Sequence, residues 1–250
     1  MRVVTPTRYG KRRGVAPNWG WCHMSLRARV ATLIGAFVLV VAGVGFVAVH
    51  FIYESPPTIN YVPYAHNGQV NVTFQTDPQN TVTTKPDWVS YFIQDPSSKQ
   101  WVHSTFFQVP ANTRVNVTIL GFDGCTPLRN PVWGKVTGTI GNVEYVNGRP
   151  VSILDSWAEC SVQHTFTMPN LGINVPIASP MTFAENSNLC STSPCTSGPH
   201  QVVQFSFRTP ATGGTFSWQC IIPCGLGYLH GNGGPMGTPG YMSGQMVVQT

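Results

Sequence analysis

The chain has 250 residues, of which only 9% are charged, and it contains 25 Gly and 21 Pro. Such a composition is typical of an all-β domain outside the cytoplasm rather than of a helical cytosolic enzyme. Seven of the 14 basic residues lie before residue 30, where there is no acid, so the remainder is slightly acidic and we expect no nucleic-acid partner.

A long apolar run follows the basic N-terminus. Residues 31–49 read ATLIGAFVLVVAGVGFVAV, and extension to Tyr53 gives 23 residues, roughly 34 Å of helix. We predict a transmembrane helix over 31–53, with residues 1–30 in the cytoplasm because basic flanks stay on that side. The alternative is a cleaved signal peptide, which has a shorter apolar stretch and a small-residue cleavage site. The protein is therefore expected in the cell membrane as a single-pass protein whose remaining residues are extracytoplasmic.

Period-two alternation begins after a linker predicted over 54–68. Apolar residues occupy alternate positions in QVNVTFQT from residue 69, in RVNVTIL from residue 114 and in QVVQFSF from residue 201. Many short strands separated by turn residues predict an all-β, Greek-key β-sandwich over 69–250. Further strands are expected at 101–109, 135–141, 164–169, 215–220 and 244–249.

Soft side chains gather in the C-terminal third of the chain. Cys220, Cys224, His230 and Met236 share one glycine-rich segment, and His164 begins a predicted strand upstream. Copper sites for electron transfer combine thiolate and imidazole ligands with a weak thioether. The pattern therefore predicts a copper site at one end of the sandwich.

Two stretches resemble cytochrome c oxidase subunit II. HTFTMPNLGIN, from residue 164, is similar to that family's H-S-F-x-x-P-x-L-G-x-K strand. FSWQCIIPCG, from residue 216, is similar to its aromatic-x-x-Q-C-x-x-x-C-G loop. The resemblance covers about 160–250 and implies a cupredoxin fold behind a membrane anchor.

The resemblance implies a binuclear copper A centre that relays electrons. The donor would be a cytochrome c-type protein and the acceptor the catalytic subunit of a haem-copper oxidase, so this chain would accept electrons rather than catalyse a reaction by itself. The cysteines would bridge two copper ions, and each histidine would bind one of them. The implied ligands are His164, Cys220, the main-chain carbonyl of Ile222, Cys224, His230 and, as a weak axial ligand, Met236.

The metal loop is longer than the family pattern. Five residues separate Cys224 from His230 and five more separate His230 from Met236, where the family has three and two. Met242 is a second thioether candidate. Two other functions remain open: a mononuclear carrier with one copper ion, and a metal-free cupredoxin assembly subunit in which Cys220 and Cys224 form a disulfide.

Compared with the family, segments of about 123–162 and 181–200 look inserted. Cys125 and Cys160 flank the first segment, and a disulfide between them would join its two ends. Cys190 and Cys195 lie in the second segment, close enough in sequence for a local disulfide. Paired cysteines are expected in an oxidising, extracytoplasmic compartment.

Overall fold

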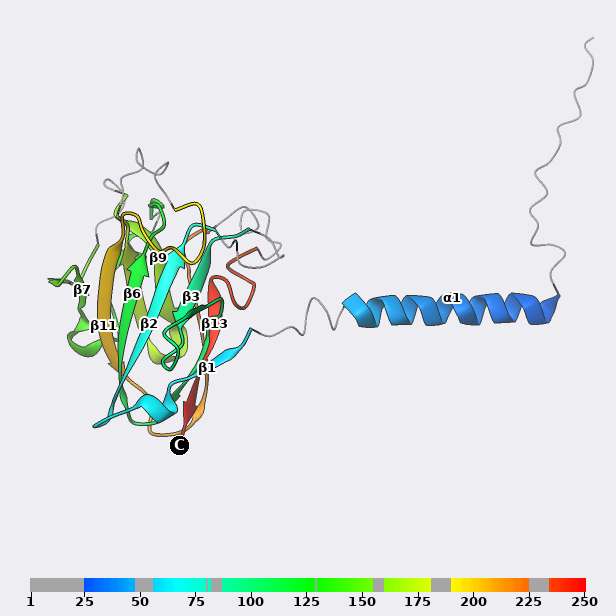
Figure 1. Cartoon of the computed structure of the whole chain (residues 1–250), viewed down its shortest axis with the longest axis horizontal. Coiled ribbons are helices and arrows are strands. Elements are labelled where there is room, and N and C mark those ends of the chain that lie inside the picture. The colour runs from blue at the N-terminus through cyan, green and yellow to red at the C-terminus, as the bar shows by residue number, and fades with distance from the viewer. Residues whose placement is uncertain are drawn as a thin grey trace, which may run out of the picture. The chain divides into compact units, whose positions relative to one another are not determined.

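The computed structural model describes residues 25–47, 56–79, 81, 87–128, 130–154, 160–180, 190–224 and 234–250. The chain divides into two units, Met1–Glu54 and Ser55–Thr250. The described part of the first unit is α1 (Leu26–Val47), and the second unit is a β-sandwich (Figure 1).

Helix α1 is long and apolar enough to cross a membrane by length and composition. It begins at Leu26 rather than at the predicted residue 31, because Ser25 caps it: the Oγ atom of Ser25 accepts a hydrogen bond from the backbone N–H of Ala28. The predicted end at residue 53 lies outside the described residues.

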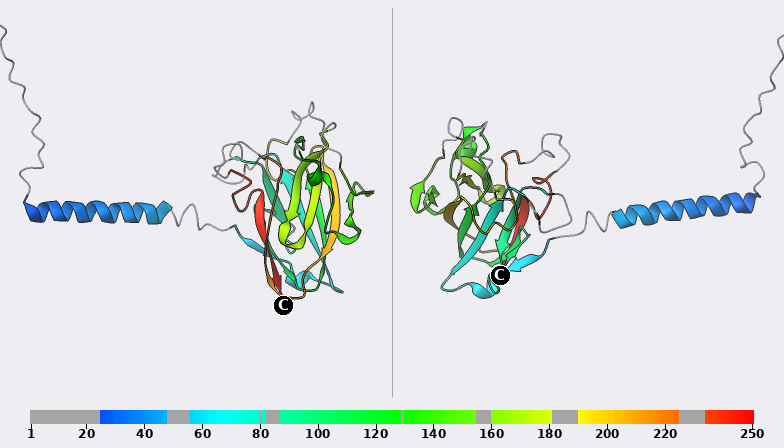
Figure 2. Two further views of the ribbon diagram at one scale, coloured as in Figure 1. Left: turned by 180° about the vertical axis from the view of Figure 1, so that it is seen from behind. Right: turned by 45° about the horizontal axis from the view of Figure 1, so that its top comes forward.

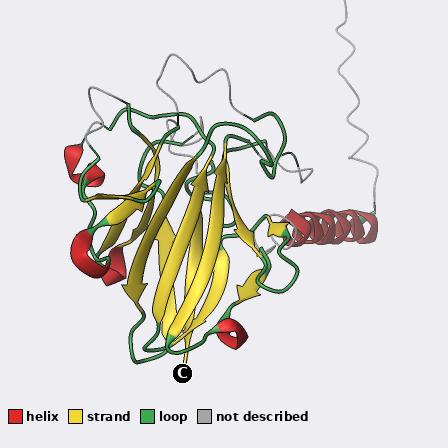
Figure 3. Cartoon of the chain, turned by 60° about the vertical axis from the view of Figure 1, so that its left-hand side comes forward, coloured by secondary structure: helices red, strands yellow, loops and turns green. Residues whose placement is uncertain are grey.

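The sandwich consists of two facing sheets. Figure 1 looks onto the seven-stranded sheet, Figure 2 also shows the molecule from behind, and Figure 3 shows the strands of both layers. In spatial order the seven-stranded sheet contains β4 (Trp101–Val102), β3 (Ser90–Gln94), β2 (Gln69–Asp77), β6 (Arg114–Gly121), β11 (Gln201–Arg208), β7 (Glu144–Val146) and β8 (Arg149–Val151). The six-stranded sheet contains β1 (Thr58–Asn60), β5 (Phe106–Pro110), β13 (Ser243–Gln249), β12 (Gly214–Gln219), β9 (Val162–Met168) and β10 (Ile173–Ala178).

Aromatic side chains fill the space between the sheets. Phe166 on β9 stacks on Trp218 of β12 with ring centroids 4.6 Å apart, and Tyr91 of β3 meets the same indole edge-on at 5.0 Å. Phe74 of β2 contacts all three rings. The inward positions alternate with outward ones along β2, β6 and β11, as the sequence predicts. The all-β class and the two-sheet sandwich are confirmed, and the histidine of β9 lies beside the C-terminal cysteine loop.

Two predicted segments are divided differently in the structure. The segment 54–68 is not only a linker, because β1 pairs in parallel with β5 and a 3-10 turn, η3 (Val62–Tyr64), follows it. The predicted strand 101–109 is two short strands, β4 and β5, which belong to different sheets.

The predicted strand at 135–141 does not form. Lys135 and Thr137 make only isolated bridges, and the chain then turns at Gly138 and enters the 3-10 turn η5 (Ile140–Asn142). Gly138 has φ +71°, and a Cβ there would lie 2.6 Å from the carbonyl oxygen of Gly172. Close contact with the turn before β10 therefore replaces strand pairing.

Both expected disulfides are present. Cys125–Cys160 joins the ends of the 123–162 segment, which carries η4 (Pro131–Gly134), η5, β7 and β8. Cys190–Cys195 closes a local loop. Residues 181–189 of the second segment lie outside the described residues.

Candidate metal centre

Strand β9 places His164 inside the sandwich. Every residue of β9 is buried, because the strand lies between β10 and β12 and the 123–162 segment packs against β10. The register between β9 and β10 shifts at Gln163: Ile177 opposes His164, but Ala178 opposes Val162. Such a bulge redirects a side chain and often lies beside a functional site. His164 is accordingly only 2% exposed.

The cysteine loop leaves β12 and is held by backbone contacts. The N–H of Cys220 donates to the carbonyl of Met242, and the N–H of Ile221 donates to the hydroxyl of Thr165 on β9. The loop is thereby attached both to β9 and to the segment before β13. This attachment fixes Cys220 beside the histidine strand.

The imidazole of His164 and the sulfurs of Cys220 and Cys224 converge on one point. Nδ1 of His164 lies 3.1 Å from Sγ of Cys224 and 3.8 Å from Sγ of Cys220, and the sulfurs are 3.2 Å apart. A disulfide would hold the sulfurs about 2.05 Å apart, so both cysteines are free. Within the described residues, no other group of three or more His, Cys, Asp or Glu side chains is arranged to hold a metal ion.

Two further predicted ligands lie beside this point. The carbonyl oxygen of Ile222 is 3.0 Å from Sγ of Cys224 and 3.5 Å from Sγ of Cys220. Met236 is buried, and its Sδ accepts a hydrogen bond from the N–H of Cys224 at 3.4 Å. His230 lies outside the described residues.

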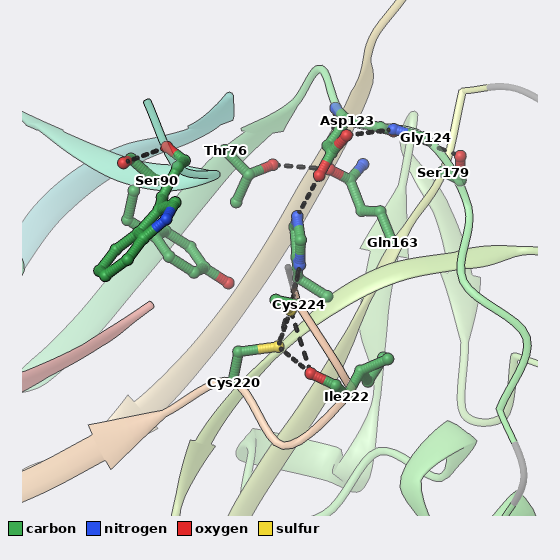
Figure 4. A network of polar contacts seen from close by, with 12 residues as sticks. Thr76, Ser90, Asp123, Gly124, Gln163, Ser179, Cys220, Ile222 and Cys224 are labelled. Carbon is green, nitrogen blue, oxygen red and sulfur yellow. Dashed lines mark hydrogen bonds and ion pairs between the residues drawn. The ribbon is translucent and has the colours of Figure 1, made fainter. Parts of the chain in front are cut away.

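On the side away from the sulfurs, His164 meets a carboxylate. Its Nε2 lies 2.8 Å from Oδ2 of Asp123, which follows β6. Figure 4 shows Cys220, Cys224 and Ile222 on one side of the imidazole and Asp123 with Gln163 on the other. A histidine that ligates a metal commonly donates its second N–H to a carboxylate, which fixes the ring and its tautomer.

A buried polar network holds Asp123 in turn. Oε1 of Gln163 accepts from the hydroxyl of Thr76 at 2.6 Å and from the N–H of Asp123 at 3.1 Å. Its Nε2 donates to the carbonyl of Ala178 at 2.6 Å. Gly121 leaves room for this amide, since a Cβ there would lie 2.2 Å from Nε2 of Gln163. Gln163, the bulged residue of β9, therefore links both sheets to the backbone of Asp123 behind the histidine.

The electrostatics of the cluster favour a charged pair when no metal is bound. Burial lowers the pKa of His164, but hydrogen bonds to Asp123 and Cys220 outweigh it and raise this pKa to about 9. Burial raises the pKa of Cys220, yet hydrogen bonds from Cys224 and His164 hold it well below its usual value. Burial and the neighbouring Cys220 raise the pKa of Cys224. A cation bound here would therefore displace protons.

The donor set fits a copper ion. With the bond lengths of a tetrahedral zinc site, about 2.3 Å to sulfur and about 2.1 Å to nitrogen, two sulfurs on one ion would be about 3.8 Å apart, and sulfur and nitrogen about 3.6 Å apart. The observed separations of 3.1, 3.2 and 3.8 Å differ from these values by about 0.6 Å or less, which small side-chain rotations can supply. Thiolate, imidazole and thioether donors together suit copper.

Sequence reasoning did not single out Asp123 or Gln163 as parts of the site. A signal for Asp123 was present: it lies two residues before Cys125, and Cys160 lies four residues before His164. The disulfide between the two cysteines therefore brings Asp123 near His164, and Thr126 N–H donates to the carbonyl of Val162 beside it. No pattern marked Gln163, because its role depends on the bulge.

Comparison with known proteins gives distant structural likenesses. No protein-family model and no curated protein matches the chain. Reduced rusticyanin is 16% identical over 77% of this chain and 84% of that chain, with a TM-score of 0.30. Rusticyanin from Thiobacillus ferrooxidans is 14% identical over 77% and 82%, with the same TM-score. A multi-copper oxidase from Pediococcus acidilactici is 9% identical over 78% of this chain and 29% of that chain, also at 0.30.

Proposed function

We propose that this chain is a membrane-anchored, extracytoplasmic copper protein that relays single electrons. The proposal rests on one observation, the convergence of Nδ1 of His164 with the two unbonded sulfurs of Cys220 and Cys224. Copper held by these donors would gain and lose one electron at a time.

The protein's own residues would prepare the site for this role. Asp123 keeps the proton on Nε2 of His164, so Nδ1 can offer its lone pair to the metal. The hydrogen bonds of Cys220 and Ile221 attach the loop to its neighbours and limit movement of the sulfurs. A site that moves little between oxidation states transfers electrons at low reorganisation cost.

We favour a binuclear centre of the copper A type. The main-chain oxygen of Ile222 lies near both sulfurs, and both sulfurs lie near the same imidazole, which suits two bridging thiolates. In this proposal Met236 would supply a weak thioether donor and His230 a second imidazole donor. A mononuclear site is the second candidate, because His164 is the one imidazole beside the sulfurs among the described residues.

The anchor and the motifs together suggest the partners. The apolar helix α1 would hold the domain at the membrane surface, with the basic N-terminus inside the cell. We propose a cytochrome c-type donor and the catalytic subunit of a haem-copper oxidase as acceptor. Copurification of the tagged chain from its native membrane with a haem-bearing subunit would support this, and its isolation without haem would contradict it.

The metal proposal is tested on the full chain in detergent, reduced and then loaded with copper. We expect copper to bind with strong thiolate-to-copper absorption that His164→Ala and Cys224→Ser abolish. His66→Ala, at an exposed histidine, is the matched control and should change nothing. Electron paramagnetic resonance then separates one copper from two by the hyperfine pattern. Failure to take up copper, or uptake of zinc alone, would contradict the proposal and favour a metal-free module.

A further inference from the structure

A hollow lies on the outer face of the seven-stranded sheet. It has a volume of about 600 Å³ and extends over β2, β6, β11 and the η5–β7 segment. Figure 1 looks onto this sheet, where these strands are labelled side by side. Ligand pockets in proteins are typically of this size. We call this hollow the sheet groove.

The floor of the sheet groove is a connected array of amides and hydroxyls. Asn116 lies at its centre: its Oδ1 accepts from Ser206 Oγ at 2.9 Å and from Arg114 Nε at 2.9 Å, and its Nδ2 donates to Oδ1 of Asn71 at 3.0 Å. Ser206 and Asn71 lie directly opposite Asn116 on the neighbouring strands, and Arg114 lies two residues before it on β6. The array is therefore ordered before any ligand binds.

Several polar atoms of the sheet groove have capacity left for a ligand. Nδ2 of Asn71, Oε1 of Gln204 and the hydroxyl of Tyr145 have no hydrogen-bond partner among the described residues. The guanidinium of Arg114 carries five N–H groups, of which one bonds Asn116 and one bonds Ser206. The floor thus offers both hydrogen-bond donors and acceptors to a ligand.

One wall of the sheet groove is apolar. Ile140 and Val143 come from η5 and the residue that follows it, and Tyr145 projects from β7 opposite Gln204. Tyr145 is 44% exposed and Ile140 is 47% exposed. An exposed tyrosine offers a flat apolar face together with a polar tip.

The charge on the lining of the sheet groove is positive. Among the described residues, Arg114 is the only charged one that lines the groove, and no carboxylate of that set pairs with its guanidinium. Arg208 lies directly opposite Arg114 across the strands but donates to the carbonyl of Asn112, outside the groove. A guanidinium without a carboxylate partner can pair with the anionic group of a ligand.

We propose that the sheet groove binds a saccharide that carries a carboxylate, such as a uronic acid unit of a cell-surface polysaccharide. Sugar hydroxyls both donate and accept hydrogen bonds, as the amide floor requires. The apolar C–H face of a sugar ring would pack on Tyr145, and the carboxylate would pair with the fork of Arg114. This inference is independent of the metal centre and requires only that the domain lies outside the cytoplasm.

The test is calorimetric titration of the full chain, in a detergent without a sugar headgroup, with a trimer of galacturonic acid. Cellotriose is the neutral comparison. We expect the acidic trimer to bind and cellotriose to bind more weakly. Arg114→Gln and Tyr145→Ala should each weaken binding about tenfold or more. Arg208→Gln removes the same charge outside the groove and should change binding less than about twofold.

Four results would overturn this proposal. They are no heat with either trimer, equal binding of the two trimers, equal effects of Arg114→Gln and Arg208→Gln, and a covalent glycan. The last is possible because Asn71 and Asn116 are each followed by Val-Thr, a glycosylation sequence, and a glycan there would fill the groove. Mass spectrometry of the intact protein detects it, and circular dichroism confirms that each variant is folded.

Discussion

Nδ1 of His164 lies 3.1 Å from Sγ of Cys224, although the two residues are 60 positions apart in the chain. The contact depends on three features: the bulge in β9, the attachment of the cysteine loop to Thr165, and the carboxylate of Asp123 behind the ring. A substitution at Asp123 changes the carboxylate, and one at Gly121 disturbs the bulged residue Gln163.

Replacement of Asp123 by Asn should weaken copper binding and raise the reduction potential. The substitution removes a negative charge 2.8 Å from Nε2 of His164, so the ring becomes a poorer donor and the oxidised ion is less stabilised. Loss of such a support typically costs about 10–100-fold in metal affinity. Competition with a copper chelator measures the affinity, and a potentiometric titration measures the potential.

The control for this change is Asp95→Asn. Asp95 caps an exposed turn through Ser97 and Ser98, which an asparagine side chain can also do. If both variants lower copper affinity equally, the effect is one of net charge, and the positioning role of Asp123 is wrong.

Gly121→Ala should destabilise the fold and disturb the site together. The new Cβ would meet Nε2 of Gln163 at 2.2 Å, so the amide must move away from Thr76 and Asp123. Overpacking of this kind costs about 1–3 kcal/mol. Denaturant unfolding gives the loss of stability, and the copper spectrum gives the disturbance of the site.

Gly214→Ala is the matched glycine, since a Cβ there makes only ordinary contacts of 3.5 Å and longer with the ring of Phe216. We expect it to change neither stability nor spectrum by a measurable amount. An unchanged spectrum in Gly121→Ala, despite lower stability, would separate Gln163 from the metal centre.

Met236→Leu decides which thioether serves the metal. Sδ of Met236 lies beside Cys224, so its replacement by Leu should preserve the fold and raise the reduction potential, because the oxidised ion loses a donor. Met242→Leu is the comparison: Met242 is buried, and its carbonyl accepts from Cys220 N–H, which the substitution leaves in place. A potential shift in Met242→Leu alone would reverse the assignment.

The sequence predicted the layers of the fold because period-two alternation records which face of each strand is buried. It predicted His164, Cys220 and Cys224 because each lies in a short motif whose residue spacing is similar to the family pattern. It did not predict the turn at Gly138, which depends on contact with Gly172, or the network through Gln163, which depends on a bulge. Such features arise from contacts between segments distant in sequence. The alternation of apolar and polar residues within one segment does not predict these contacts.

A buried acid outside the ligand set should make stability depend on pH. Asp77 on β2 accepts hydrogen bonds from the N–H of Cys195 and from Gln75, but burial outweighs these bonds and raises its pKa from 3.8 to about 7. Between about pH 4 and pH 7 the unfolded chain has released this proton while the folded chain keeps it. Stability therefore falls as the pH rises through this window and changes no further above it.

Asp77→Asn removes this titration. The free energy of unfolding of the variant, minus that of the parent, should increase from pH 4 to pH 7 by up to about 4 kcal/mol and then stay constant. Fluorescence of the buried Trp218 reports unfolding in denaturant. Asp95→Asn is the contrasting variant, because hydrogen bonds from Ser97 and Ser98 lower the pKa of Asp95 to about 2. The free energy of unfolding of Asp95→Asn, minus that of the parent, should therefore change with pH only below about pH 4. A flat difference for Asp77→Asn across the window would mean that the pKa of Asp77 is the same in the folded and the unfolded chain, and that burial does not raise it.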